Sequence, residues 1–475
     1  MSSYAFSFDA SACTGCKACQ VACKDKNNLP VGVLWRRVME VSGGEWLQTG
    51  KTWSNTVFAY NLSMACNHCL HPKCAGVCPT NAYQVRPDGI VLLDSSKCVG
   101  CGYCNWACPY AVPQYNPAAG VMSKCNFCYD ALDAGQPPAC VAACPLRVLD
   151  FLQVDEDAGD LAGLPLWQLP GAEHPFPLPS FSRTQPHLLI RPHAGMLNPL
   201  DKQLANREEI KPAQPKSELP LVFFSLLAQM AVGGFWASQW LFPPFLSLVQ
   251  SDIFFPRLLS QALVGICLGL GALVSFAHLG QKRNAWRVIA NYRKSWLSRE
   301  ILALGLFGAG WLLSVIFPMP VLGALTSLMG LGLVYSMANI YQLRSMAVWN
   351  SWRTLAGFLV SASLLGLAGM APVWRLTAEA GGVMLPPAQL AWVYGLELAL
   401  LAGELGLQFA GWKPRGQADW LRTGLLGMGM LALLELLLIG RAGGPWFDLS
   451  FLVVVWAEEI LGRWRFYHEL EGRRL

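Results

Sequence analysis

The spacing of cysteines is the strongest chemical signal in this chain. Sixteen of its seventeen cysteines fall into four groups of four that end before Pro145. The groups are Cys13, Cys16, Cys19 and Cys23; Cys66, Cys69, Cys74 and Cys78; Cys98, Cys101, Cys104 and Cys108; and Cys125, Cys128, Cys140 and Cys144. The first and third read C-x2-C-x2-C-x3-C, and the second and fourth have four and eleven residues between their middle cysteines. Because three closely spaced thiolates and a remote fourth suit an iron–sulfur cubane, this pattern predicts [4Fe–4S] clusters and electron transfer.

Two other uses of cysteine fit this spacing less well. Zinc prefers isolated C-x2-C pairs, and the tighter groups would crowd too many thiolates around one tetrahedral ion. Disulfides suit small secreted domains, but Met1 to Ala10 has no basic stretch followed by an apolar run, so we expect no secretory signal there. We therefore expect cluster ligands rather than a zinc site or a disulfide framework.

Composition divides the chain into three parts. The hydrophobic fraction is 53% and the charged fraction only 14%, and the apolar excess lies almost entirely after residue 218. Residues 1–154 carry the cysteine groups and predict an α+β iron–sulfur domain built as a doubled ferredoxin-like unit. Residues 155–217 are rich in proline, which predicts an extended strap and linker. Residues 218–475 predict an all-α membrane domain.

Eight apolar stretches after residue 218 approach the length of a membrane-spanning helix. They are Leu219–Leu241, Leu258–Leu279, Ile301–Phe317, Val321–Tyr341, Leu355–Ala371, Gln389–Trp412, Gly424–Gly440 and Leu449–Leu461. A soluble helical bundle would not need so many stretches of this kind. The sequence therefore predicts a bundle of about eight transmembrane helices in the bacterial inner (cytoplasmic) membrane.

The charges of the connecting loops predict the orientation of this bundle. If the cysteine-rich part lies on one side, the loops after the second, fourth and sixth stretches and the C-terminus return to that side. That side then carries fifteen Lys and Arg residues, whereas the opposite side carries only Arg257, Arg375 and Arg441. Because basic loops stay in the cytoplasm, we expect the iron–sulfur domain to face the cytoplasm. The net charge of +5 follows from this topology and predicts no nucleic-acid partner.

Longer motifs resemble one enzyme family. The iron–sulfur subunit of dimethyl sulfoxide reductases is similar to residues 4–152, through CTGCKACQVACKD, VFAYNLSMACNHCLHPKCAGVCPTNAY, KCVGCGYCNWACPYAVPQYN and MSKCNFCYDALDAGQPPACVAACPLRVLDF. The membrane anchor subunit of the same family resembles the second half, through QMAVGGFW, SFAHLG, LSREI and EEILGRWRFY. These subunits are usually two polypeptides in the family and are fused here. The resemblance implies a separate catalytic subunit with a molybdenum bis-pterin cofactor, whereas this chain exchanges electrons with menaquinone or ubiquinone.

The resemblance also implies how the cysteines are shared between clusters. Three cysteines of one group hold a cluster together with the last cysteine of another group. The implied sets are Cys13, Cys16 and Cys19 with Cys144; Cys125, Cys128 and Cys140 with Cys23; Cys66, Cys69 and Cys74 with Cys108; and Cys98, Cys101 and Cys104 with Cys78. Some relatives replace one cysteine and form a [3Fe–4S] cluster. All sixteen positions are cysteine here, which implies four [4Fe–4S] clusters.

A histidine and a glutamate are candidates for handling the protons of quinone. His278 lies at the end of the second apolar stretch, and Glu300 opens the third. Quinone reduction takes up two protons with two electrons, which calls for groups such as an imidazole and a carboxylate. The family's quinol site resembles this position, and ionisable residues in membrane spans are usually functional. The alternative is that His278 is an interfacial residue and Glu300 a helix cap.

Other polar residues extend this candidate site. An arginine of the family aligns near Asn284, and Arg283 and Arg287 on either side are both candidates for contacting quinone. Glu404 is a further candidate for quinone binding. Because Glu397 and Glu404 are seven residues apart, they share one face of the sixth stretch. They form a proton path or pack polar against polar within the bundle.

Haem is the competing membrane cofactor. A transmembrane b-type haem needs two axial histidines at matching depth. Only His278 qualifies within the apolar stretches, and His468 lies apart in the tail. We therefore expect no haem. Cys267, in the middle of the second stretch, is interpreted as a small core residue.

These features predict an electron-transfer and membrane-anchor subunit of a molybdopterin oxidoreductase complex. The polypeptide itself offers no molybdenum site, so its partners are the molybdopterin subunit, the quinone pool and the lipid bilayer. A cytoplasm-facing domain favours an enzyme similar to a sulfite dehydrogenase that feeds electrons into quinone. One alternative is an outward-facing dimethyl sulfoxide reductase that oxidises menaquinol. Another is a quinone-linked module that moves ions through the intramembrane glutamates.

Overall fold

The computed structural model describes residues 2–155, 178–196, 206–207, 219–241, 254–346, 348–380, 387–410, 417–439 and 444–468. The chain divides into two compact units, and most of the predicted proline-rich strap lies outside the described residues. The cysteine-rich unit comprises Met1–Pro215 together with Gly280–Ser295, and the helical unit comprises Lys216–Leu279 and Trp296–Gly472. This division differs from the one expected from composition, because a segment between two apolar stretches belongs to the cysteine-rich unit.

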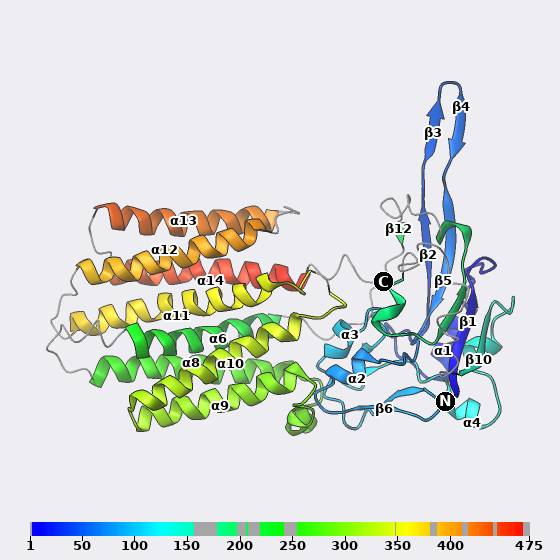
Figure 1. Cartoon of the computed structure of the whole chain (residues 1–475), viewed down its shortest axis with the longest axis horizontal. Helices are drawn as coiled ribbons and strands as arrows, with labels where there is room; N and C mark the ends of the chain where they lie inside the picture. Colours follow the sequence, from blue (N-terminus) through cyan, green and yellow to red (C-terminus); the bar gives the residue numbers. More distant parts are fainter. Residues whose placement is uncertain are drawn as a thin grey trace. The chain divides into compact units, whose positions relative to one another are not determined.

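Two three-stranded sheets frame the cysteine-rich unit (Figure 1). The first has the order β10 (Leu149–Asp155), β1 (Ser2–Asp9), β11 (Leu188–Arg191), and the second has the order β12 (Asn206–Arg207), β2 (Arg37–Gly43), β5 (Phe58–Met64). β1 pairs antiparallel with β10 and parallel with β11. The core beside these sheets includes Phe6, Phe8 and Phe127, and Phe6 stacks on Phe127 with ring centroids 4.1 Å apart.

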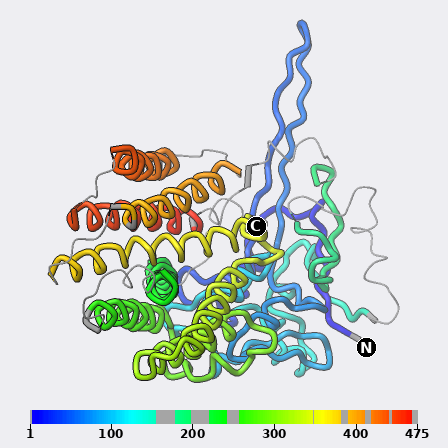
Figure 2. Tube along the Cα trace, turned by 60° about the vertical axis from the view of Figure 1, so that its left-hand side comes forward, coloured from blue at the N-terminus to red at the C-terminus, as the bar shows by residue number. Residues whose placement is uncertain are grey.

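Hairpins and short helices complete the described part of this unit. The hairpins are β3 (Trp46–Thr49) with β4 (Thr52–Asn55), β6 (Tyr83–Val85) with β7 (Val91–Leu93), and β8 (Gln114–Asn116) with β9 (Val121–Ser123). The helices are α1 (Ala18–Lys26), α2 (Lys73–Val77), α3 (Tyr103–Ala107), α4 (Tyr129–Asp133) and α5 (Ala139–Ala142). Figure 2 shows β2 and β5 continuing into the long β3–β4 ribbon. Each helix contains a grouped cysteine or directly follows one, so the short elements position the thiols.

Long helices build the helical unit. They are α6 (Leu219–Trp236) with its extension η5 (Ala237–Leu241), α8 (Phe254–His278), α9 (Trp296–Ile316), α10 (Pro320–Tyr341), α11 (Trp352–Ala380), α12 (Pro387–Ala410), α13 (Gln417–Ile439) and α14 (Pro445–His468). Seven of them are long and apolar enough to cross a membrane, and α14 is the more charged eighth. The prediction of a polytopic bundle of about eight helices is therefore confirmed.

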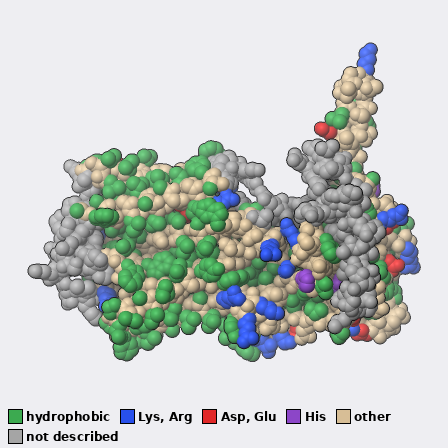
Figure 3. Space-filling view, viewed as in Figure 1, with side chains coloured by type: hydrophobic (Ala, Val, Ile, Leu, Met, Phe, Trp, Pro, Cys, Tyr) green, Lys and Arg blue, Asp and Glu red, His purple; other side chains and the backbone are tan. Residues whose placement is uncertain are grey.

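Helices α6 and α11 form the centre of the helical unit. Their most apolar windows are 67% and 61% buried, against 17% for α13 and 22% for α9. A side chain on Gly233 of α6 or Gly366 of α11 would meet the backbone of the other helix, so these glycines allow close contact. The outer helices instead expose large apolar residues such as Leu273, Leu328 and Leu438. Figure 3 shows apolar side chains over the visible face of the helices, as expected for a surface in lipid.

Candidate metal centres

A left-handed turn precedes the second cysteine of every group. The residues are Gly15, His68, Gly100 and Phe127, with φ of 71°, 43°, 71° and 62°. Glycine adopts this conformation freely, whereas His68 and Phe127 must be held in it by their surroundings. In two of these turns the amide N–H of Gly100 and of Phe127 points at the Sγ of the first cysteine, at 3.4 Å. The four loops therefore share a left-handed turn, and in two of them a backbone donor points at sulfur.

The thiols come together in sets that combine different groups. Thiols within each set below lie near enough to influence one another electrostatically, and two such interactions also cross between sets, from Cys19 to Cys140 and from Cys125 to Cys66. Cys144 joins Cys13, Cys16 and Cys19; Cys23 joins Cys125, Cys128 and Cys140; Cys108 joins Cys66, Cys69 and Cys74; and Cys78 joins Cys98, Cys101 and Cys104. These are the sets that the family resemblance implies. Their role as cluster ligands remains a prediction.

Two of the sets line cavities. Cys66, Cys69, Cys74 and Cys108 line one cavity, and Cys13, Cys16, Cys19 and Cys144 line another. Across the described ranges, no three Cys, His, Asp or Glu side chains converge closely enough to hold a single metal ion. Thiols arranged around a cavity suit a cluster of several iron and sulfide atoms better than one tetrahedral zinc.

Buried cations lie beside these sets. Arg36, Arg37 and Lys124 are 2%, 3% and 4% exposed, and none of them pairs with a carboxylate among the described residues. The Nε and Nη2 atoms of Arg36 also have no hydrogen-bond partner there. Although burial alone would lower it, the neighbouring thiols of Cys140 and Cys125 raise the pKa of Arg36. An unpaired buried guanidinium is costly, and the negative charge of thiolate-bound clusters would compensate for it. The residues therefore fit [4Fe–4S] clusters.

Burial holds several of the thiols in their protonated form unless iron displaces the proton. Burial raises the pKa of Cys23 to about 12, of Cys101 to about 12 and of Cys108 to about 11. Iron binds the thiolate, so cluster assembly at these positions must release protons. When bound, the clusters supply one-electron transfer, and the protein's part is to bury and orient their ligands.

Sequence reasoning missed several residues that shape these sets. His68 is fully buried, its Nδ1 accepts the N–H of Val91 at 3.0 Å, and its ring meets Phe127 edge-on at 5.2 Å. Burial lowers the pKa of His68 well below its usual value, so its imidazole is neutral. The available signal was its place directly before the second cysteine of its group, a place that Phe127 also occupies. Arg36 had no such signal.

The segment between α8 and α9 forms hydrogen bonds to two cysteines of one set. This α8–α9 segment, Gly280–Ser295, includes the helical turns of η6 (Lys282–Ile289). The Nδ2 of Asn284 donates to the carbonyl of Cys98 at 2.9 Å, and the Nδ2 of Asn291 donates to the carbonyl of Cys78 at 2.8 Å. Because Cys78 and Cys98 belong to the same set, the two asparagines tie both halves of that set to one segment.

Further contacts hold the α8–α9 segment against the cysteine loops. The backbone N–H of Gln281 donates to the carbonyl of Val99 at 3.1 Å. The hydroxyl of Ser295 donates to the carbonyl of Val77 at 2.7 Å. A side chain on Gly120 would lie 2.8 Å from the carbonyl oxygen of Gly280. Glycine at Gly120 leaves room for this approach, and its φ of +67° also favours glycine.

The predicted quinone residues divide between the two units. In the helical unit, His278 is the last residue of α8, and Glu300 is 5% exposed near the start of α9. Glu404 of α12 forms an ion pair with Arg422 of α13. These placements leave the roles of His278 and Glu300 as predictions, and they put Glu404 within a network of buried charges.

The two arginine candidates lie in the cysteine-rich unit, on the α8–α9 segment. Arg283 is exposed, and the guanidinium of Arg287 lies 4.8 Å from the ring centroid of Trp286. Asn284, between them, is occupied by its bond to Cys98. Contact of either arginine with quinone remains a prediction.

Two comparisons with protein families cover most of the sequence. Residues 57–154 match the family described as 4Fe-4S dicluster domain, and residues 214–401 match the DMSO reductase anchor subunit (DmsC). The B subunit of the anaerobic dimethyl sulfoxide reductase of Escherichia coli (strain K12) is 44% identical over 212 residues, which are 44% of this chain and 98% of that protein. The protein belongs to the dimethyl sulfoxide reductase family. It joins an iron–sulfur subunit and a membrane anchor in one polypeptide, as the sequence motifs indicated.

Other relatives act in related complexes. The thiosulfate reductase electron transfer subunit PhsB of Salmonella typhi is 42% identical over 155 residues, which are 32% of this chain and 77% of that protein. The formate dehydrogenase iron-sulfur subunit of Wolinella succinogenes is 39% identical over 167 residues, which are 30% of this chain and 78% of that protein. The chain is thus an electron-transfer and anchor subunit of an oxidoreductase complex of the dimethyl sulfoxide reductase family.

We predict that the purified protein contains about sixteen iron atoms and sixteen acid-labile sulfides, as four cubanes require. Cys23→Ser should remove the EPR signal of the set that contains Cys125, Cys128 and Cys140, because Cys23 lies beside those thiols. The signal of the set with Cys13 should remain. Cys267→Ser is the matched control, since Cys267 lies in α8, outside the four groups. About eight iron atoms, stoichiometric zinc, or loss of the Cys13 set instead would contradict the assignment.

Proposed function

We propose that this chain passes electrons between the quinone pool and a separate molybdopterin catalytic subunit through four [4Fe–4S] clusters. The cysteine-rich unit carries the clusters, and the helical unit anchors them and binds quinone. The names of the relatives support such an assembly, since they are electron-transfer or iron–sulfur subunits of reductases and a dehydrogenase.

The α8–α9 segment is the observation that carries this proposal. It bonds to the backbone of Cys78 and Cys98, and it follows His278 and precedes Glu300 in the sequence. The α8–α9 segment therefore bonds to one set, that of Cys78, Cys98, Cys101 and Cys104. In the sequence, this segment lies between the two predicted quinone residues. We assign this set as the place where electrons pass between quinone and the other clusters.

Two side chains handle protons in this proposal. Quinone takes up two electrons and two protons to become quinol, and the reverse reaction releases them. A carboxyl at Glu300 and an imidazole at His278 are groups that can each accept and donate a proton. Burial of Glu300 keeps bulk water away from its carboxyl, so proton exchange there must use neighbouring side chains. Arg283 and Arg287 are the cations proposed to steady the quinone oxygens.

A cytoplasmic position of the clusters is the finer part of the proposal. The α8–α9 segment carries Lys282, Arg283, Arg287, Arg293 and Lys294, and it belongs to the cysteine-rich unit. The strongly basic loop thus lies with the clusters, which supports a cytoplasmic location by the positive-inside rule. An enzyme in this position that feeds electrons into quinone would resemble a sulfite dehydrogenase.

The second candidate is an outward-facing dimethyl sulfoxide reductase that oxidises menaquinol. The observation in its favour is the identity of 44% to the B subunit of the Escherichia coli dimethyl sulfoxide reductase over nearly the whole of that subunit. The two candidates differ in the side of the membrane and in the direction of electron flow, and both use the same clusters and quinone residues.

Removing the proton-handling groups should stop quinone chemistry and spare the clusters. We expect His278→Ala and Glu300→Gln to lower quinol-linked electron transfer by at least about a hundredfold, the usual contribution of a general acid or base. Reduction of the clusters by dithionite and assembly with the catalytic subunit should be unchanged. Glu435→Gln is the control, because Glu435 is an exposed glutamate of α13. Wild-type quinol kinetics in both variants would place the quinone site elsewhere.

Reporter fusions test the orientation. A fluorescent protein that folds only in the cytoplasm should be bright when fused to the N-terminus, which belongs to the cysteine-rich unit. The same reporter after Leu475 should also be bright, because eight crossings return the tail to that side. Alkaline phosphatase should be inactive at both ends. Active phosphatase with dark fluorescent fusions would restore the outward-facing reductase, and opposite results at the two ends would show an odd number of crossings.

A further inference from the structure

One buried arginine lies beside two of the cysteine sets. Arg36 directly precedes β2, and its guanidinium lies near enough to thiols of both sets for them to act on its charge. Cys140 and Cys125 act most strongly, followed by Cys19 and Cys23. We call the two sets the Cys13 set (Cys13, Cys16, Cys19 and Cys144) and the Cys125 set (Cys23, Cys125, Cys128 and Cys140). Arg36 is therefore a neighbour of two predicted clusters.

Arg36 reaches the Cys13 set through a serine of β5. Its Nη1 donates to the hydroxyl oxygen of Ser63 at 3.2 Å and to the backbone carbonyl of Ser63 at 3.3 Å. The same hydroxyl lies 3.3 Å from the Sγ of Cys19. Because an arginine can only donate, the Ser63 oxygen accepts from Arg36, and its hydrogen is left for the sulfur of Cys19. Arg36 thus orients a hydrogen bond toward a predicted ligand of the Cys13 set.

The rest of Arg36 lies against the Cys125 set. Its Nε and Nη2 atoms are buried and have no hydrogen-bond partner in the described part of the chain. Its Cζ lies over the ring of Phe6 at 4.5 Å, and Phe6 stacks on Phe127, whose backbone N–H points at the Sγ of Cys125. The backbone amide of Arg36 also lies beside Cys23 and stabilises its thiolate. These contacts leave two nitrogen donors of Arg36 for cluster sulfur.

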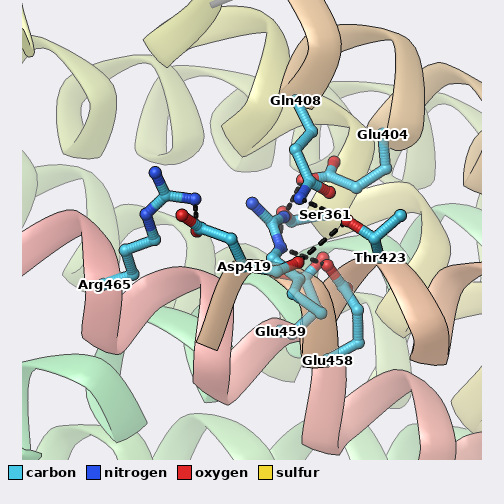
Figure 4. Close-up of polar contacts among 9 residues, drawn as sticks. Ser361, Glu404, Gln408, Asp419, Thr423, Glu458, Glu459 and Arg465 are labelled. Carbon is cyan, nitrogen blue, oxygen red and sulfur yellow. Dashed lines mark hydrogen bonds and ion pairs between the residues drawn. The ribbon is translucent and has the colours of Figure 1, made fainter. Parts of the chain in front are cut away.

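Buried arginines of the helical unit are compensated in another way. Arg422 of α13 donates to Glu404 of α12 and to Glu458 of α14, and both glutamates are labelled in Figure 4. Arg36 instead has thiols around it and pairs with no carboxylate within the described ranges. A buried cation is stable only where opposite charge or hydrogen bonds compensate for its lost hydration. The thiolate-bound clusters would supply both to Arg36.

We propose that Arg36 and Ser63 set the midpoint potentials of the clusters held by the Cys13 set and the Cys125 set. This inference rests on the proposed assignment of [4Fe–4S] clusters to these sets. One-electron reduction adds one negative charge to a cluster without making or breaking a bond, and a buried cation stabilises that charge. Arg36 stays protonated at physiological pH, so it raises both potentials. The Ser63 hydroxyl raises that of the Cys13 set further, because hydrogen bonds to ligand sulfur favour the reduced cluster.

A single cation can serve both clusters because the two sets are neighbours. Cys19 of one set and Cys140 of the other lie near enough to influence each other electrostatically. Arg36 therefore makes these two clusters an adjacent pair that accepts electrons more readily than they would without it. Its role is one of positioning charge and hydrogen bonds, and it takes no part in proton transfer.

The next residue in the chain provides a matched control. Arg37 is also buried, but its Nη2 donates to the backbone carbonyls of Tyr110 and Ala111, at 3.0 Å and 3.1 Å. The thiol that acts on its charge is Cys108, which belongs to the set with Cys66, Cys69 and Cys74. Replacing Arg37 thus removes a buried arginine from the same strand region without removing the cation beside the Cys13 and Cys125 sets.

EPR-monitored redox titration of the complete complex tests this role. Arg36→Met should shift the redox equilibria of the Cys13 and Cys125 clusters at least about tenfold toward the oxidised form, which lowers each midpoint potential by about 59 mV for one electron. Ser63→Ala should lower the potential of the Cys13 cluster alone. Arg37→Met should leave both potentials unchanged. The signals are identified by their loss in Cys144→Ser and in Cys23→Ser, and iron content is measured for each variant.

Two further variants decide the matter if Arg36→Met binds less iron. Arg36→Lys keeps the charge, so the potential of its Cys125 cluster should stay near the wild-type value, and Ser63→Ala removes only one hydroxyl. An unchanged Cys13 potential in Ser63→Ala, or a Cys125 potential in Arg36→Lys as low as that expected without the cation, would then overturn the inference. With full iron in Arg36→Met, unchanged potentials or equal shifts in Arg37→Met would overturn it.

The wild-type complex separates this inference from the proposed function. If it shows four cluster signals that quinol reduces, and the potentials do not move in the Arg36 and Ser63 variants, the role of Arg36 is wrong and the proposed function stands. If the signals assigned to the Cys13 and Cys125 sets are absent from the wild-type complex, the cluster assignment is wrong, and the role of Arg36 is overturned with it.

Discussion

The hydrogen bonds from the α8–α9 segment to the backbone of Cys78 and Cys98 are the contact on which the rest of the molecule depends. Through them, residues that lie between two apolar helices in the sequence become part of the cysteine-rich unit. Asn284 and Asn291 each donate to a carbonyl next to a ligand thiol, so a shift of the segment would move both halves of one set together. The proposed flow of electrons and the supply of protons both take their positions from this segment.

The fold of the cysteine-rich unit depends more on compensating its buried charges than on a large apolar core. Arg36, Arg37 and Lys124 are cations that an apolar interior would not hold without compensating negative charge. Left-handed His68 and Phe127 carry backbone strain that the surrounding packing must balance. Both features are explained if four clusters supply the negative charge and tie the loops together. The helical unit solves the same problem differently, by pairing the buried Arg422 with Glu404 and Glu458.

The sequence predicted the parts of this architecture that follow from local rules. Cysteine spacing predicted the four groups, the family resemblance implied how the groups combine into sets, and apolar length predicted the helices from α6 to α14. It missed what depends on contacts between distant residues. Nothing local to Arg36 indicates that it is buried beside two sets, and Asn284 looked like a departure from the family pattern rather than a bond to Cys98. Glu404 was expected near quinone or in a polar face of α12, and its partners Arg422, Glu458 and Glu459 come from α13 and α14.

The order in which quinol reduces the clusters tests the central claim most directly. Freeze-quench EPR after mixing the oxidised complex with quinol should show the set of Cys78, Cys98, Cys101 and Cys104 reduced first. That signal can be identified by its loss in Cys101→Ser. Replacing Asn284 and Asn291 by alanine should delay this first reduction and shift the midpoint potential of that cluster alone, because hydrogen bonding around the ligands sets the potential. Earlier reduction of any other cluster, or an unchanged order and potential in the double variant, would contradict the account.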